Sequence, residues 1–79
     1  MSDFDLREEL RAHPEVKNTY CVNQKMPPTY ERKWKLNIMW TDGDVSTILG
    51  RDERGSEDVY RQGLRSADAK MLRHRGEGR

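Results

Sequence analysis

The residue pair best suited to nucleophilic catalysis is Cys21 with His13, because a thiol nucleophile needs a base within reach. The predicted elements place Cys21 within a strand and His13 just after a helix. Only Lys17 and Lys25 are cations close to Cys21 in the sequence. Together with His74, the same two residues also lack the ligand spacing of a zinc site. We therefore interpret Cys21 as a small, half-buried strand residue and expect no catalytic site.

Asp42 and Asp44 flank Gly43 and resemble the start of a calcium-binding loop. Position 12 of such a loop would be Glu53, but the pattern of residues 45–49 between them predicts a strand. An Asp-Gly pair is also the preferred centre of a tight hairpin turn, and this is the better explanation. No glycine-rich phosphate loop occurs in the chain. We expect neither a metal nor a cofactor.

Residues 30–35, Tyr-Glu-Arg-Lys-Trp-Lys, interleave basic and aromatic side chains. Such a run can anchor a protein partner, since Trp, Tyr and Arg dominate interface hot spots. It can also bind a nucleic-acid strand by stacking and phosphate contacts, or be an ordinary strand with its lysines in solvent. On the predicted second helix, two arginines lie one turn apart. The candidate partner-binding residues are Tyr30, Arg32, Lys33, Lys35, Arg61 and Arg65.

The most regular pattern in the chain is the alternation in residues 33–40, which predicts a half-buried strand. Its apolar face consists of Trp34, Leu36, Ile38 and Trp40. The strand leads into Asp42-Gly43, typical of a two-residue type I′ turn, and residues 45–50 form the returning strand. This turn predicts three cross-strand pairs on the apolar face: Trp40–Val45, Ile38–Thr47 and Leu36–Leu49.

Two further elements precede the hairpin. A helix over residues 3–12 can be capped by Ser2, and its narrow apolar stripe consists of Phe4 or Leu6 with Leu10. A strand over residues 16–25 is predicted to place Val16, Tyr20 and Val22 on one face and Lys17, Thr19, Cys21 and Asn23 on the other.

A polar loop over residues 51–55 and a helix capped by Ser56 follow the hairpin. The apolar stripe of this helix consists of Tyr60, Leu64, Ala67 and Met71. Gly63 within it is either a weak point or a site of close approach. The element order predicts an α+β fold, α-β-β-β-α, in which a three-stranded antiparallel meander packs against one or both helices.

The 79 residues carry a net charge of +1 and one cysteine. We treat residues 1–79 as a single domain with a frayed tail at 76–79. With no internal disulfide, no membrane-length apolar stretch and no signal peptide, we expect a soluble cytoplasmic protein. The nearly balanced charge argues against a dedicated nucleic-acid-binding protein. The core is expected to be thin, and homodimerisation would supplement it.

In its size, its lack of a catalytic motif and its charged composition (37% Asp, Glu, Lys and Arg), the chain resembles small phage-encoded anti-CRISPR proteins that act on type I surveillance complexes. The resemblance implies a non-enzymatic inhibitor that docks on a host protein complex and blocks binding of target DNA. The alternative is a small nucleic-acid-binding or regulatory protein. It would use the basic-aromatic strand and the basic end of the second helix, where Arg73, His74 and Arg75 lie.

Overall fold

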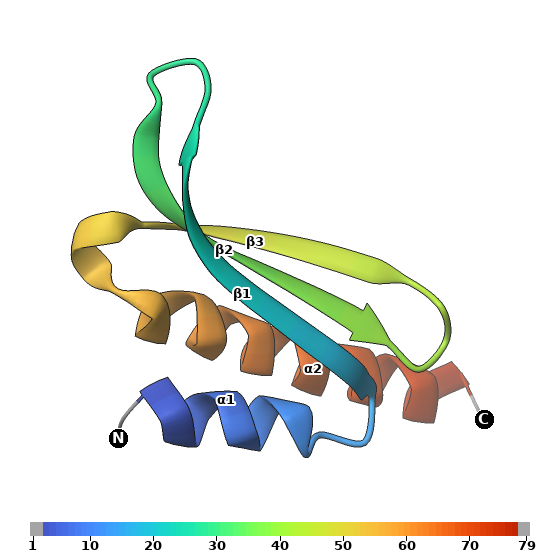
Figure 1. Cartoon of the computed structure of the whole chain (residues 1–79). Helices are drawn as coiled ribbons and strands as arrows, with labels where there is room; N and C mark the ends of the chain where they lie inside the picture. Colours follow the sequence, from blue (N-terminus) through green and yellow to red (C-terminus); the bar gives the residue numbers. More distant parts are fainter. Residues whose placement is uncertain (1–2, 78–79) are drawn as a thin grey trace.

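The computed structural model describes residues 3–77, and it confirms the α-β-β-β-α order. Its elements are α1 (Asp3–Arg11), β1 (Val16–Met26), β2 (Glu31–Trp40), β3 (Val45–Arg51), a short 3-10 helix η1 (Asp52–Arg54) and α2 (Ser56–Glu77). The strands form one antiparallel sheet in the order β1-β2-β3. Both helices lie on the same face of this sheet, and the other face, here called the outer face, is uncovered (Figure 1).

Helix α2 extends through Glu77, so residues 76 and 77, which were expected to form a frayed tail, are helical. Residues 78 and 79 lie outside the described residues, and so does the proposed helix cap Ser2. Within residues 3–77, no helix has both the length and the apolar character needed to cross a membrane.

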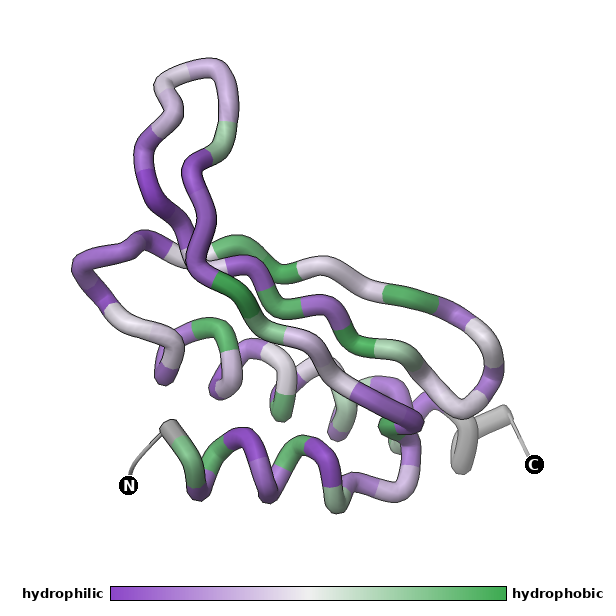
Figure 2. Tube along the Cα trace, in the orientation of Figure 1, coloured by the Kyte–Doolittle hydropathy of each residue, from purple (hydrophilic) through white to green (hydrophobic). Residues whose placement is uncertain are grey.

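The core lies between the helices and the predicted apolar face of β2. Leu36, Ile38 and Trp40 are buried there, and Trp34 is half-buried against the same cluster. Helix α1 contributes Leu6 and Leu10, so both helices pack on the sheet. Helix α2 contributes Val59, Tyr60 and Ala67. Figure 2 shows hydrophobic and hydrophilic residues alternating along β2, as expected for a strand with one buried face. The buried face of α2 is rotated slightly from the predicted apolar stripe, because Val59 is fully buried and Leu64 is only partly buried.

Close approach explains Gly63. A Cβ at this position would lie 3.1 Å from the terminal methyl groups of Leu10, Leu36 and Ile38, three residues that are completely buried. Only a glycine lets α2 lie this near to both α1 and β2, which confirms the second of the two interpretations.

The predicted register of β2 and β3 is wrong by one residue. The turn has three residues instead of two, since the Trp40 amide donates to the Asp44 carbonyl at 2.9 Å and only Gly43 has a positive φ. Ile38 therefore pairs with Ser46, and Leu36 with Ile48. Because a one-residue slip turns every side chain to the other face, Ile48 packs on the core and the expected core residues Val45, Thr47 and Leu49 lie on the outer face.

A β-bulge overturns the prediction for β1 in the same way. The register shifts between Val16, which pairs with Trp40, and Asn18, which pairs with Met39. The extra residue exchanges the two faces of the strand beyond it. Thr19 and Cys21 consequently point toward the core, and Tyr20, which is 61% exposed, points outward.

Strands β1 and β2 continue beyond the end of β3. The last residue of β3, Arg51, pairs with Lys33, whereas β1 and β2 remain paired to Met26 and Glu31. We call this two-stranded extension, residues 25–32, the arm. It rises away from the sheet and is largely hydrophilic (Figures 1 and 2). Its tip contains a cis Pro27–Pro28 bond and Tyr30, which is 64% exposed.

Candidate functional site

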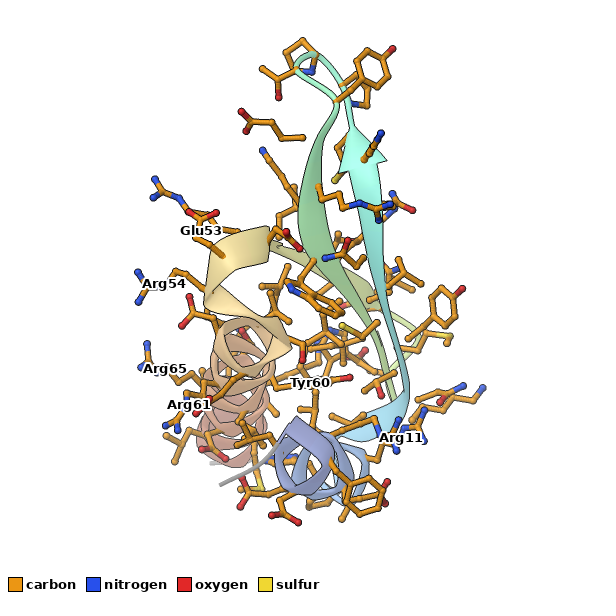
Figure 3. The ribbon with its side chains drawn as sticks, turned by 60° about the vertical axis from the view of Figure 1, so that its left-hand side comes forward. Arg11, Glu53, Arg54, Tyr60, Arg61 and Arg65 are labelled. Carbon is orange, nitrogen blue, oxygen red and sulfur yellow. The ribbon has the colours of Figure 1, made fainter. Side chains whose placement is uncertain are left out.

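The six predicted partner-binding residues fall into two separate groups. Tyr30 and Arg32 belong to the arm, Lys33 lies at its base, and Lys35 follows on the outer face of β2. Arg61 and Arg65 lie on the solvent side of α2 near Arg54, away from the arm (Figure 3). The structure therefore does not bring the six residues into one surface.

The charges on α2 are largely compensated within the helix and its approach. Arg61 pairs with Glu57 one turn earlier, and this contact lowers the pKa of the Glu57 carboxyl. Arg54 pairs with Asp58 at 3.2 Å. Arg65 is exposed and has no ion pair among the described side chains. This surface has the character of an ordinary solvated helix, where such pairs add little stability.

The strands, in contrast, hold an excess of positive charge. They contain six basic residues and one acidic residue, while the rest of the chain contains nine basic and thirteen acidic residues. The sheet thus carries +5 and everything else −4, which gives the overall +1. The nearly neutral sum hides this segregation, so the sequence-based argument against an anionic partner loses its force.

Four of these cations form two pairs in which like charges lie directly opposite each other. Lys25 pairs with Arg32 in the arm, and Lys33 pairs with Arg51 at its base. Cross-strand neighbours have Cβ atoms only about 5 Å apart, and like charges at these positions destabilise a sheet. By strand alternation, the first pair lies on the helix-side face of the hairpin and the second pair on the outer face, beside Lys35.

Carboxylates lie near these two pairs, because Glu31, Asp52 and Glu53 line a hollow together with three of the four cations. Arg51 has a loose contact with Glu53 at 3.9 Å, and Arg32 donates a hydrogen bond to the neutral Asn23 at 3.2 Å. Lys25 and Lys33 make no ion pair among the described side chains. The repulsion is therefore compensated only in part, and an external anion would relieve it further. Sequence reasoning found Arg32 and Lys33 but missed Lys25 and Arg51, whose importance appears only with the strand register.

The residues considered for catalysis have structural partners. The Glu15 amide donates to His13 Nδ1 at 3.2 Å, and His13 Nε2 bonds Asp68 at 3.1 Å, which ties the end of α1 to α2. Cys21 contacts the Tyr60 hydroxyl instead. Burial, followed by this hydrogen bond, raises the pKa of Tyr60 to about 12. His13 and Cys21 therefore serve different contacts.

The two aspartates that resembled a calcium loop bind a lysine. The Nζ atom of Lys70, on α2, lies 2.8 Å from Asp42 and 3.3 Å from Asp44, and 5.2 Å from the centre of the Trp40 ring. The hydrogen bond to Asp42 is the main reason that the pKa of Lys70 is raised, so its amine stays charged.

Among the described residues, no three His, Cys, Asp or Glu side chains are grouped so that they could hold a metal ion. No known protein family matches the chain, and no curated protein or solved structure shows significant similarity to it.

Proposed function

We propose that this protein is a non-enzymatic binding domain that docks its basic sheet and arm on the phosphate backbone of double-stranded nucleic acid. The observation that carries the proposal is the pair of like-charge cross-strand contacts, Lys25 with Arg32 and Lys33 with Arg51. A fold that keeps such contacts with only loose internal counterions is locally inconsistent, and inconsistencies of this kind are typical of functional surfaces.

The shape of the arm favours a duplex over an acidic protein. A two-stranded ribbon fits the major groove of B-DNA, which is about 12 Å wide and has phosphates along both walls. The arm and its base carry a cation pair on each face, so both walls can be contacted at once. Phosphate contacts of this type position a protein without reading sequence. Tyr30 at the tip provides an exposed ring that can meet the bases or sugars.

A protein partner is the second candidate, because the outer face also carries exposed apolar side chains, most of them on the edge strands β1 and β3. Its apolar residues are Tyr20, Val22, Met39, Val45 and Leu49. Three of them, Tyr20, Val45 and Leu49, are 61%, 64% and 47% exposed. Exposed apolar side chains that lie together on one face can mark a site of protein interaction. The inhibitor of a type I CRISPR-Cas complex that the sequence resemblance implies would use this face, and it stays a prediction.

Salt-dependent binding to a short labelled DNA duplex tests the first proposal, measured by fluorescence anisotropy. Five cations can contact phosphates: Lys25, Arg32, Lys33, Lys35 and Arg51. With about 0.9 counterion released per contact, the logarithm of the association constant should fall against the logarithm of salt with a slope of about −4.5.

Lys25→Gln and Lys33→Gln should each weaken binding and bring the slope to about −3.6. The control is Arg65→Gln on α2, which removes an exposed cation far from the arm and should leave both quantities unchanged. Absence of binding at low salt, or equal loss in all three variants, would overturn the nucleic-acid proposal and favour the protein partner.

A further inference from the structure

A small hollow lies on the helix side of the sheet, where α1, the two long strands and the start of α2 meet. Its volume is about 230 Å³, and its lining residues are Phe4, Arg7, Cys21, Trp34, Ser56 and Tyr60. Figure 3 shows Tyr60 extending from α2 into the region between α1 and the sheet. Pockets that bind drug-sized ligands have volumes of roughly 300–1,000 Å³, so an occupant of this hollow must be smaller than such a ligand.

Two of the residues that line this hollow have a buried hydrogen-bond donor without an acceptor. Among the described residues, the buried side-chain nitrogen and oxygen atoms that lack a hydrogen-bond partner are Arg7 Nε and Trp34 Nε1, and both residues line the hollow. The other indole in the chain is satisfied, since Trp40 Nε1 donates to Ser46 at 2.8 Å. Buried donors are normally paired, and an unpaired one calls for a specific explanation. One occupant with two acceptor oxygens could satisfy both.

The electrostatics of the hollow favour a negative occupant. The Arg7 guanidinium lies 5.2 Å from the centre of the Phe4 ring, and its ion pair with Glu8 is loose at 3.7 Å. The first residue of α2, Ser56, is in the wall, and a helix N-terminus carries partial positive charge. The first-turn acids of α2, Glu57 and Asp58, are already paired with Arg61 and Arg54.

The walls also suit a flat apolar body, because three of the six lining residues are the aromatic Phe4, Trp34 and Tyr60. We propose that the hollow binds a small aromatic carboxylate. One carboxylate oxygen accepts from Trp34 Nε1 and the other from Arg7 Nε, while the ring lies among the aromatic side chains. This site is separate from the arm, and the proposal does not depend on nucleic-acid binding.

Benzoate is a suitable probe, and the two indole N–H resonances of ¹⁵N-labelled protein are the readout. Titration to millimolar benzoate should shift the Trp34 indole resonance saturably and leave that of Trp40 unchanged. Benzyl alcohol has the ring without the charge, and acetate has the charge without the ring. Both should bind at least ten-fold more weakly.

Two variants separate recognition from general surface effects. Trp34→Phe keeps a ring and removes the N–H, and Arg7→Met keeps an apolar stem and removes the guanidinium. Each should weaken benzoate binding at least ten-fold, measured for Trp34→Phe by backbone amide shifts. Arg65→Gln should have no effect.

The site would be refuted if benzoate caused no saturable shift, or if Arg7→Met, verified as folded by its melting curve, bound benzoate like the unmodified protein. Equal affinities for acetate and benzoate would show an adventitious anion only. Equal affinities for benzyl alcohol and benzoate would show that the two donors play no part.

Discussion

At Gly50, β3 lies very close to α2, and replacing this glycine with alanine tests the packing between the two elements. A Cβ at position 50 would lie 2.5 Å from Cγ1 of Val59, which is completely buried. Gly50 is not among the residues with positive φ, so its backbone conformation permits alanine. Any loss of stability in Gly50→Ala therefore comes from lack of space and not from backbone strain.

The expected loss follows from two opposing effects. Overpacking a core typically costs about 1–3 kcal/mol, and the upper end applies because a valine in a helix has one strongly preferred rotamer. Removing a glycine from a strand returns about 0.5–1 kcal/mol. We expect Gly50→Ala to lower the free energy of unfolding by about 2 kcal/mol, which lowers the Tm of a domain of this size by about 8–16 °C.

A double-mutant cycle with Val59→Ala isolates the contact. Val59→Ala removes two methyl groups, each worth about 0.8 kcal/mol, and leaves a small cavity, so it should also cost about 2 kcal/mol. In the double variant the new Cβ occupies the space that Cγ1 vacated. The combined loss should then be about 2 kcal/mol instead of about 4, measured by urea denaturation. Additive losses, or a Gly50→Ala variant as stable as the unmodified protein, would refute the close approach of β3 and α2.

Two further predictions concern the hairpin register and a buried tyrosine. In urea denaturation, Ile48→Ala should lower the free energy of unfolding by about 2 kcal/mol and Leu49→Ala by under about 0.5 kcal/mol, because only Ile48 packs on the core. A larger loss for Leu49→Ala than for Ile48→Ala would support a two-residue turn. Because the folded pKa of Tyr60 is about 12 and that of an unfolded tyrosine about 10, the Tm should fall as the pH rises from 10 to 12, and it should fall less in Tyr60→Phe.

The element order and the apolar face of β2 were predictable because strict alternation and helix-start residues are local signals. Which residues of the edge strands β1 and β3 face the core was not predictable. An Asp-Gly pair suits a two-residue turn and also a three-residue turn whose last residue is a glycine with positive φ. Since β3 has apolar residues at both odd and even positions, its pattern does not choose between the two. The bulge near Asn18 has no comparable sequence signal.

The candidate site was predictable in part. The basic-aromatic run is visible in the sequence. The positive sheet is not, because residues 1–31 have a net charge of −2 and residues 32–79 a net charge of +3. Grouping the charges by predicted strand would have revealed the positive sheet. The like-charge pairs depend on register, and the hollow unites Arg7, Trp34 and Tyr60 from three distant segments. Only the tertiary structure brings such residues together.

The Lys70 contact means that the two ends of β2 differ in how firmly they are held to the rest of the domain. Near Trp40, the strand runs into a turn whose two aspartates are tethered to α2 by one amine. Near Glu31, the same strand is bonded only to β1 and has no helix beneath it (Figure 1). Because the arm end of β2 has fewer packing partners than the turn end, we expect the arm to open locally at a lower free energy than the turn.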